Sequence, residues 1–451
     1  MNHKKPMSTY VYKQNKLYGK IEEGRFFIYK DNEYALDDIG LAEITDILPE
    51  GIDLQIMLRS FNKQNPIELL PYLKNTIGDF SFSRLEKNKS NDNVILSNIE
   101  ITDKFPNVLH CDIDISTSFL VSPQYLDLSI GKKQMLSLSG YQHKLQVSIV
   151  NNTITDNYGD FILKPCSDKY YDLPINEHLN VSFMREFGFE VPFNALVYDE
   201  RQKEYHYLIK RFDIDENGDK LPQISLNSLM KSKDKYDGTI ERISTFLKDK
   251  LVCIQKMQFL KYIYANALLY NNDLHKKNIS FVFKDNKLIL SPAYDVLNVY
   301  AVKPTSKMDI LGKEQCYLTI KGSKNGITIS HFEQASKNIG LDFGKVQASL
   351  NDIQNIYIKK YPQYIKNITK IPNIRLIAEF TQKLQESYDK NLKKIAHSKT
   401  TYTDKLKAQI PNLNTEQKQS AKQFLNEIRQ SRNADNKKDT AQRQSKSRSK
   451  Q

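Results

Sequence analysis

Cysteine is scarce in this sequence, and no stretch of it stays apolar for long. The four cysteines lie far apart without paired spacing, at Cys111, Cys166, Cys253 and Cys316. This pattern fits buried thiols in a reducing cytosol better than disulfides or a zinc site. No segment has the apolar length of a membrane span, and residues 1–20 lack the apolar core of a signal peptide. We therefore expect a cytoplasmic protein without a membrane partner.

The overall composition of the chain is that of a globular protein. Hydrophobic residues make up 39% and aromatic residues 10% of a 451-residue chain, enough for two lobes or for two to three domains. The formal charge of +13 invites a nucleic-acid interpretation, but residues 431–451 alone carry seven Lys or Arg against two Asp. The chain before residue 431 is only mildly basic for its size. Phosphate-binding lysines account for that excess, and nucleic-acid binding by the tail stays open.

The most informative stretch runs from Leu268 to Val296 and reads LLYNNDLHKKNISFVFKDNKLILSPAYDV. Apolar residues with the helical period lead into it, at Ile254, Met257, Tyr264 and Leu268. The asparagine pair at 271–272 is predicted to end that helix. Alternating residues from 279 then predict a strand, a turn at 285–286 and a returning strand. Such a hairpin brings Asp295 back beside Asp273 and Asn278.

These three side chains suit metal-assisted phosphoryl transfer. An Asp followed five residues later by an Asn is the spacing of a kinase catalytic loop, in which Asp273 orients the acceptor hydroxyl and Asn278 holds Mg²⁺. Asp295 would supply the second metal ligand, and Mg²⁺ needs few protein oxygens because phosphate and water complete its shell. The alternative is a solvated loop on an Asn-rich protein, since short patterns match by chance.

The segments NNDLHKKN and LSPAYD resemble the catalytic and metal-binding segments of the HipA-like serine/threonine kinases, the toxin components of bacterial toxin–antitoxin pairs. The resemblance implies an α/β, two-lobed protein-kinase-like fold of HipA type. It has a mixed sheet in the amino-terminal lobe, a small amino-terminal subdomain and a mostly helical carboxy-terminal lobe. In the catalytic loop His275 is expected to organise the backbone, Lys277 to steady the transferring phosphate, and Lys276 to be solvated. Tyr294 is expected to pack beside the metal carboxylate.

The run SLSGYQHK, residues 137–144, is similar to the phosphate-covering loop of this family. A Ser/Gly turn entering a strand presents backbone N–H groups to phosphates, although one glycine alone is a weak signal. The resemblance assigns nucleotide contacts to Ser139, Gly140, Tyr141, Gln142, His143 and Lys144. It also implies autophosphorylation of Ser137 or Ser139, whose added negative charge would repel the ATP phosphates.

Two further motifs follow in the order that the family requires. FILKP places Lys164 at the end of a strand, where it is expected to contact the ATP phosphates and to pair with Glu177 of the next helix, near 175–187. KRFD resembles the hinge between lobes and assigns nucleotide contacts to Lys210, Arg211, Phe212 and Asp213. Family members often carry an acidic residue at the position of Lys210, so its side-chain role is open.

The predicted organisation has four parts. An accessory subdomain spans residues 8–105, a nucleotide-binding lobe 106–213, a catalytic helical lobe 214–397, and a basic, largely disordered tail 398–451, with a short helix near 417–428. The amino-terminal module carries no chemistry in this interpretation.

The resulting hypothesis is a Mg²⁺- and ATP-dependent serine/threonine-protein kinase that acts as a toxin. The resemblance implies an aminoacyl-tRNA synthetase or other translation factor as protein substrate. It also implies a DNA-binding antitoxin as partner, so nucleic acid is contacted indirectly. Two alternatives stay open, a lipid or small-molecule kinase and a non-catalytic nucleotide-binding co-repressor.

Overall fold

The structure, a computed structural model, describes residues 8–37, 40–86, 94–117, 120, 142–167, 169–305, 312–409 and 419. The chain divides into two compact units, Met1–Tyr388 and Asp389–Gln451, and all predicted site residues belong to the first. The boundaries expected at residues 105 and 213 stay predictions. So does the boundary at 397, although helix α10 (Ile377–Gln409) crosses it. The helix expected near 417–428 lies outside the described residues apart from residue 419.

The amino-terminal module is a five-stranded antiparallel sheet in the order β4-β3-β2-β1-β5. Strands predicted near residues 9–12 and 25–29 are confirmed as β1 and β3. Val11, Phe26 and Ile44 are fully buried and form one core with Leu69. The elements are β1 (Thr9–Lys13), β2 (Lys16–Glu22), β3 (Arg25–Lys30), β4 (Glu33–Leu36), α1 (Gly40–Thr45), α2 (Gly51–Ser60), η1 (Pro66–Tyr72) and β5 (Phe80–Ser83).

A seven-stranded mixed sheet follows, in the order β6-β12-β13-β10-β8-β9-β7. The β10 strand lies in its middle, between β13 and β8, which places Lys164 opposite Tyr207. All residues of helix α4 are buried, which fits its run of apolar and small polar side chains. The elements are β6 (Val108–Leu109), β7 (Asp112–Asp114), β8 (Leu145–Val150), β9 (Thr153–Thr155), β10 (Phe161–Lys164), β11 (Tyr170–Tyr171), α4 (Leu173–Met184), β12 (Asn194–Asp199) and β13 (Glu204–Lys210).

The rest of the first unit is mostly helical around the predicted hairpin. That hairpin is confirmed as β15 and β16, and its turn residues Asp285 and Asn286 have φ of 49° and 58°, which Asp and Asn tolerate. The elements are β14 (Gln223–Ser225), α5 (Leu226–Leu229), α6 (Ile240–Leu247), α7 (Cys253–Leu268), η4 (Lys276–Asn278), β15 (Ser280–Lys284), β16 (Lys287–Leu290), η5 (Val299–Ala301), β17 (Lys303–Pro304), η6 (Ile329–Phe332), α8 (Glu333–Ile339), α9 (Phe343–Ile368) and α10.

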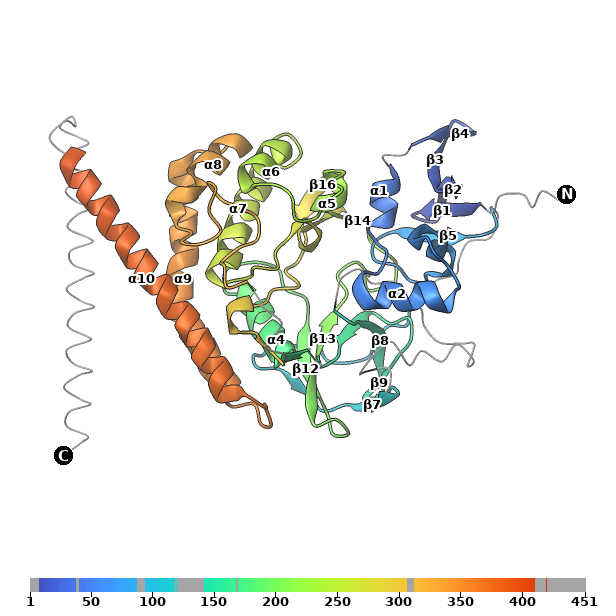
Figure 1. Cartoon of the computed structure of the whole chain (residues 1–451), viewed down its shortest axis with the longest axis horizontal. Helices are drawn as coiled ribbons and strands as arrows, with labels where there is room; N and C mark the ends of the chain where they lie inside the picture. Colours follow the sequence, from blue (N-terminus) through green and yellow to red (C-terminus); the bar gives the residue numbers. More distant parts are fainter. Residues whose placement is uncertain are drawn as a thin grey trace. The chain divides into compact units, whose positions relative to one another are not determined.

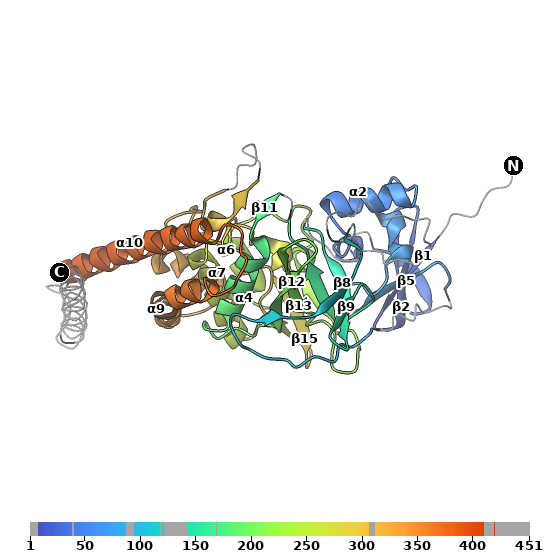
Figure 2. The same cartoon turned by 90° about the horizontal axis from the view of Figure 1, so that it is seen from below.

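Within the first unit, the seven-stranded sheet lies between the amino-terminal module and helices α7 and α9 (Figures 1 and 2). Helix α7 confirms the helix predicted before the catalytic loop, and Tyr264 and Leu268 are buried in it. Ile254, which the periodicity placed on the same face, is 67% exposed. It lies in the first turn of α7, at the edge of the region that the helix packs against.

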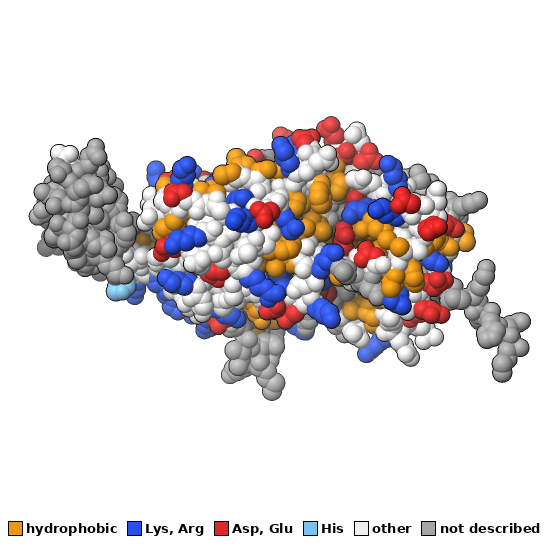
Figure 3. Space-filling view, turned by 90° about the horizontal axis from the view of Figure 1, so that it is seen from above, with side chains coloured by type: hydrophobic (Ala, Val, Ile, Leu, Met, Phe, Trp, Pro, Cys, Tyr) orange, Lys and Arg blue, Asp and Glu red, His pale blue; other side chains and the backbone are white. Residues whose placement is uncertain are grey.

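On the face drawn in Figure 3, described Lys and Arg side chains are interspersed with Asp and Glu side chains. A surface of this kind does not by itself indicate a nucleic-acid interface. Among the described residues, no helix combines the length and the apolar character that crossing a bilayer would require.

Candidate active site

The three predicted oxygen-bearing side chains come from segments that hydrogen bonds hold together. Asn278 Nδ2 donates to the carbonyl oxygen of Asp273 at 3.0 Å, which closes the catalytic loop on itself. Asn271, two residues before Asp273, donates from Nδ2 to the carbonyl oxygen of Asp295 at 3.2 Å. Helix α7 ends at Leu268, before the asparagine pair, and the buried Asn271 joins the catalytic loop to the segment that carries Asp295.

Asp295 lies among lysines in a left-handed backbone conformation. Its φ is +51°, a strained value for a non-glycine residue outside a turn and one that is common at functional sites. Its carboxylate pairs with Lys164 and lies 3.6 Å from the Nζ of Lys144. Burial alone would raise the pKa of Asp295, but the two ammonium groups outweigh it and hold the pKa well below its usual range. The carboxylate is therefore ionised.

Lys164 is buried between two carboxylates. Its Nζ lies 2.5 Å from Glu177 Oε1, and the second partner is Asp295. The side chains of Lys164 and Glu177 are only 5% and 1% exposed. Burial would lower the pKa of Lys164, but the two carboxylates raise it above its usual value, so it stays charged. The expected Lys164–Glu177 ion pair is thus present in the structure, with Glu177 in the second turn of α4 because that helix begins at Leu173.

The side chain of Asp273 is exposed, yet surrounding protein atoms still disfavour its charged form. Burial is the main cause and the nearby Asp295 carboxylate the second, and together they raise the pKa of Asp273 to about 6. His275 is buried, which lowers its pKa to about 4, and its Nδ1 has no hydrogen-bond partner among the described residues. A neutral, enclosed imidazole fits an organising role better than a proton-transfer role.

Two carboxylates that the sequence interpretation missed pair with the catalytic loop. Lys277 Nζ lies 2.9 Å from Asp46 Oδ1 and 2.6 Å from Glu50 Oε1, both in the amino-terminal module. Glu50 also pairs with Lys235 at 2.6 Å, and the two lysines lower its pKa to about 2 despite its burial. The module, predicted to carry no chemistry, therefore contributes side chains to this region, and the ammonium of Lys277 is already neutralised.

Side chains of the hinge motif form hydrogen bonds with the amino-terminal module. Arg211 donates to Asp213 at 2.7 Å from Nη2, and to the carbonyl oxygens of Asn75 and Thr76 at 3.0 and 3.1 Å. Asp213 also accepts from the N–H of Gly78 at 2.8 Å. Both side chains are buried and tie β13 to the amino-terminal module. The nucleotide contacts assigned to Arg211 and Asp213 stay predictions, and in the structure their side chains engage each other.

Most of the predicted site residues that the structure describes line one cavity. The Tyr294 hydroxyl shares a hydrogen bond with Ser280 Oγ at 2.6 Å and donates to the carbonyl oxygen of Lys277 at 3.1 Å. Its ring packs against that of Phe212, with 5.4 Å between the ring centroids. Predicted site residues that line the cavity are Lys144, Lys164, Lys210, Arg211, Phe212, Asp213, His275, Lys277, Asn278, Tyr294 and Asp295. An apolar wall suited to the flat base of a nucleotide is formed by Ile77, Ile162, Ile209 and Ile224.

The structure describes the predicted phosphate loop from Gln142 onward. Ser137, Ser139, Gly140 and Tyr141 lie outside the described residues. His143 is described, and its Nδ1 lies 3.3 Å from Asp53 of α2, which ties the end of the loop to the amino-terminal module. Gln142 lies at the start of this described segment, and Lys144 reaches Asp295 as given above.

The donor set fits a magnesium ion held jointly with phosphates. The described residues contain no cluster of three His, Cys, Asp or Glu side chains that would hold a metal alone. Asp295 is ionised, and Asn278 uses its amide nitrogen toward Asp273, which leaves its oxygen to accept. One carboxylate and one amide oxygen match the few protein ligands that Mg²⁺ takes when phosphates and water complete its shell.

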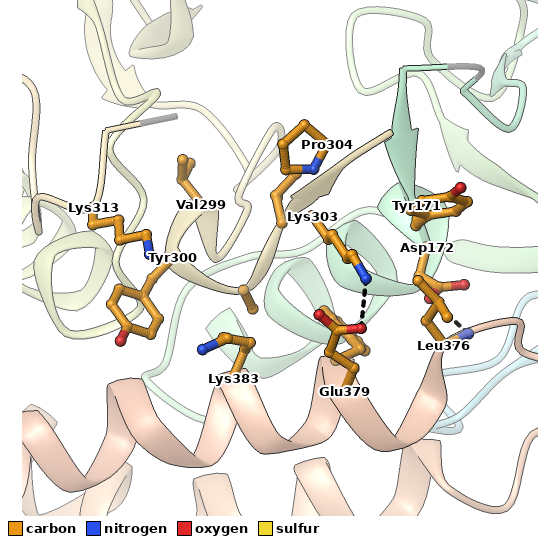
Figure 4. A pocket seen from close by; sticks show the side chains of 13 residues that line it. Tyr171, Asp172, Val299, Tyr300, Lys303, Pro304, Lys313, Leu376, Glu379 and Lys383 are labelled. Atoms are coloured by element: carbon orange, nitrogen blue, oxygen red, sulfur yellow. Dashed lines mark hydrogen bonds and ion pairs between the residues drawn. The ribbon is translucent and has the colours of Figure 1, made fainter. Parts of the chain in front are cut away.

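A second cavity, of about 320 Å³, lies between β11, β17 and the start of α10 (Figure 4). Its polar side chains are partly paired: Lys303 lies 2.7 Å from Glu379, and Asp172 accepts from the N–H of Leu376 at 3.3 Å. No predicted site residue lines it. The other cavity is lined by most of the described predicted residues, although Asp273, Glu177, Gln142 and His143 are not among its lining residues.

Comparisons with known proteins identify related kinases and a related toxin. The HipA-like C-terminal domain matches residues 136–360. A putative kinase of Haemophilus influenzae is 30% identical over 271 residues, covering 56% of this chain and 78% of that protein. Toxin YjjJ of Escherichia coli is 29% identical over 139 residues, 30% of this chain and 31% of that protein. The HipA structure from the Shewanella oneidensis complex with HipB and operator DNA has a TM-score of 0.60 at 16% identity, covering 84% of this chain and 96% of that chain.

The structural likeness confirms the predicted α/β, two-lobed kinase-like fold. The match of residues 136–360 spans the phosphate loop, the hinge, the catalytic loop and Asp295, which are the motifs that carried the resemblance. The match to the Haemophilus protein covers most of that relative. The chain belongs to the HipA-like kinase family.

Proposed function

We propose that this protein transfers the γ-phosphate of ATP to a serine or threonine of a protein, with Asp273 at the acceptor hydroxyl. The observation that carries the proposal is the convergence of Asp295, Lys164 and Lys144 beside the loop of Asp273 and Asn278. ATP with Mg²⁺ supplies the activated phosphate and neutralises part of its charge. The residues of the chain position and orient: Asn278 and Asp295 would hold the ion, and Lys164 and Lys144 would bind phosphate oxygens.

In this proposal Asp295 exchanges partners when the nucleotide binds. Its carboxylate pairs with Lys164 and Lys144 in the structure, and with Asp295 holding the ion both lysines would be available to phosphate oxygens. Glu177 keeps Lys164 in position throughout, because it approaches the ammonium from the buried side. Catalysis of this type depends on positioning and on charge neutralisation more than on covalent chemistry.

The partner classes are also proposals. The Shewanella HipA was solved with HipB and operator DNA, which supports a DNA-binding antitoxin for this chain and contact with nucleic acid through it. The family resemblance supports a translation factor, such as an aminoacyl-tRNA synthetase, as substrate. The competing proposal of a non-catalytic co-repressor has less support, because Asp273, Asn278 and Asp295 are all present. A lipid or small-molecule kinase would share these residues, and the nature of the labelled acceptor distinguishes it.

An experiment with γ-labelled ATP and cell lysate tests the proposal. Wild-type protein should label a protein band that disappears with the Asp273→Asn variant, and solvent extraction should leave the label in the protein fraction. Label in the lipid fraction would favour the lipid kinase, and no label with intact ATP binding would favour the co-repressor.

Autophosphorylation is a separate expectation. After incubation with Mg²⁺ and ATP, intact-mass analysis should show the added mass of one phosphate group. Replacing the acceptor serine, by Ser137→Ala or by Ser139→Ala, should remove this added mass. Phosphate near the ATP site adds nearly two negative charges, so the modified protein should transfer phosphate more slowly. An unchanged mass in wild type and both variants would contradict the expected switch.

The rate should depend on the protonation of Asp273. Because burial raises its pKa to about 6, the carboxylate is charged above that pH and protonated below it. We expect kcat/KM to fall about tenfold per pH unit below about pH 6, since this parameter reports the free enzyme's base. The acid limb of kcat should lie at lower pH, because a cation at Asp295 favours the charged form. A profile of kcat/KM that is flat from about pH 5 to 8, with circular dichroism unchanged, would contradict this role.

A further inference from the structure

The connection between α1 and α2, residues 46–50, carries two carboxylates that line the nucleotide cavity, the cavity that most predicted site residues line. Asp46 Oδ2 accepts hydrogen bonds from Ser225 Oγ and, at 2.7 Å, from Ser228 Oγ. Its other oxygen, Oδ1, lies 2.9 Å from the Nζ of Lys277. One side chain therefore joins the amino-terminal module both to the β14–α5 segment and to the catalytic loop, in line with the place of α1 beside α5 (Figure 1).

The second carboxylate belongs to Glu50. This residue stands at the N-cap of α2, but its side chain makes no capping hydrogen bond. Its Oε1 lies 2.6 Å from the Nζ of Lys277, and its Oε2 lies 2.6 Å from the Nζ of Lys235. The N–H of Lys276 donates to the carbonyl oxygen of Lys235 at 3.1 Å, so Lys235 is itself bonded to the catalytic loop. Two carboxylates thus face two ammonium groups, and these four charges balance.

Of the two lysines in the catalytic loop, Lys277 lines the nucleotide cavity. Lys276, which was expected to be solvated, is instead only 2% exposed, and its ammonium donates to Ser232 Oγ at 2.5 Å. An ammonium group has three N–H donors, and Asp46 and Glu50 engage two of those of Lys277. Within the described contacts, one donor is therefore left for a phosphate oxygen. Burial would lower the pKa of Lys277, but the two carboxylates raise it above its usual value, so the group stays charged.

We propose that Asp46 and Glu50 are positioning residues for phosphate transfer, which hold the ammonium of Lys277 in the cavity so that its remaining donor binds the transferring phosphate. This inference rests on the proposed function and adds the amino-terminal module to it. Contacts from two carboxylates restrict a long, flexible side chain to one place, as Glu177 does for Lys164. Because two lysines balance their charge, the carboxylates add little repulsion toward ATP.

Replacing either carboxylate tests the proposal. With γ-labelled ATP and cell lysate, Asp46→Asn and Glu50→Gln should each lower the maximal rate of protein labelling about tenfold or more, the usual cost of a misplaced group, and leave the KM for ATP nearly unchanged. The matched control is Asp31→Asn. Asp31 is exposed in the turn between β3 and β4 at φ +52°, so this variant should keep both parameters.

A double variant shows whether Asp46 acts through Lys277. Lys277→Met should show a loss of rate like that of Asp46→Asn, and combining the two should slow transfer no further. A carboxylate that only stabilises the fold would instead add its own loss to that of Lys277→Met.

Chemical labelling of Lys277 gives a measurement that does not depend on transfer. Paired with two carboxylates, the ammonium holds its proton and should react slowly with an amine-specific reagent. In Asp46→Asn and in Glu50→Gln it should react several-fold faster, as mass spectrometry of the labelled protein would show.

The outcomes separate this inference from the proposed function. If Lys277 becomes more reactive in the variants but wild-type protein transfers no phosphate, the holding of Lys277 stands and the kinase proposal fails. If wild-type protein transfers phosphate and both variants match or exceed its rate, the positioning role is overturned and the kinase proposal stands. Unchanged reactivity of Lys277, or a further loss of rate in the double variant, also overturns the positioning role.

Discussion

Replacing Asp273 by Asn should reduce phosphate transfer by about 10² to 10⁴-fold, the usual contribution of a positioned acid–base group. The amide keeps the shape of the side chain. It can neither take the proton of the acceptor hydroxyl nor orient that hydroxyl through a negative charge. Steady-state transfer from labelled ATP measures this effect. The hydrogen bond from Asn278 goes to the backbone of Asp273, so the loop should keep its structure.

The matched control for this prediction is Asp285→Asn. Asp285 is exposed in the turn of the β15–β16 hairpin at φ +49°, a conformation that Asn adopts equally well. It should leave transfer and ATP binding unchanged. Wild-type-like turnover by Asp273→Asn, with the same thermal stability as wild type, would remove Asp273 from the proposed chemistry.

Replacing Lys164 by Met should affect both stability and activity. Lys164 and Glu177 form a pair whose side chains are almost completely buried, and breaking such a pair typically costs about 3–5 kcal/mol because one charge stays behind. Here Glu177 would be left without its counter-charge, and Asp295 would keep only Lys144. Urea unfolding should show the loss in the free energy of unfolding, and ATP binding should fall with it.

A second variant distinguishes loss of fold from loss of function. Lys164→Met combined with Glu177→Gln removes the uncompensated buried charge, so the free energy of unfolding should recover in part. Phosphate transfer should not recover, because the lysine is still missing. Lys287→Met, at an exposed position in β16, serves as the control for removal of a lysine. Recovery of transfer in the double variant would contradict the role of Lys164.

Much of the central fold could be predicted because its signals are local. Helix α7 and the β15–β16 hairpin follow from the spacing of apolar residues and from an Asp-Asn turn within 40 residues or so. Lys164 and the loop of Asp273 and Asn278 are singled out by the family resemblance, because a strand-end lysine is usually solvated and a short spacing matches by chance. These features need no knowledge of distant contacts.

The contacts that sequence patterns missed are all distant along the chain. Asp46 and Glu50 of the amino-terminal module contact Lys277, and Glu50 is separated from Lys277 by 227 positions along the chain. No period or spacing reports such a pairing. Arg211 and Asp213 show the converse case. Their motif indicated a nucleotide site. The residues that bind their side chains belong to the amino-terminal module and are Asn75, Thr76 and Gly78.

The central claim is that Asn278 and Asp295 hold one divalent ion beside a bound triphosphate, and metal-dependent nucleotide binding tests it most directly. Calorimetric titration with a non-hydrolysable ATP analogue should give tight binding to wild-type protein only when Mg²⁺ is present. Asp295→Asn and Asn278→Ala should lose that metal dependence, whereas Asp273→Asn should retain it. Equal binding with and without Mg²⁺, or full metal dependence in both Asp295→Asn and Asn278→Ala, would contradict the account.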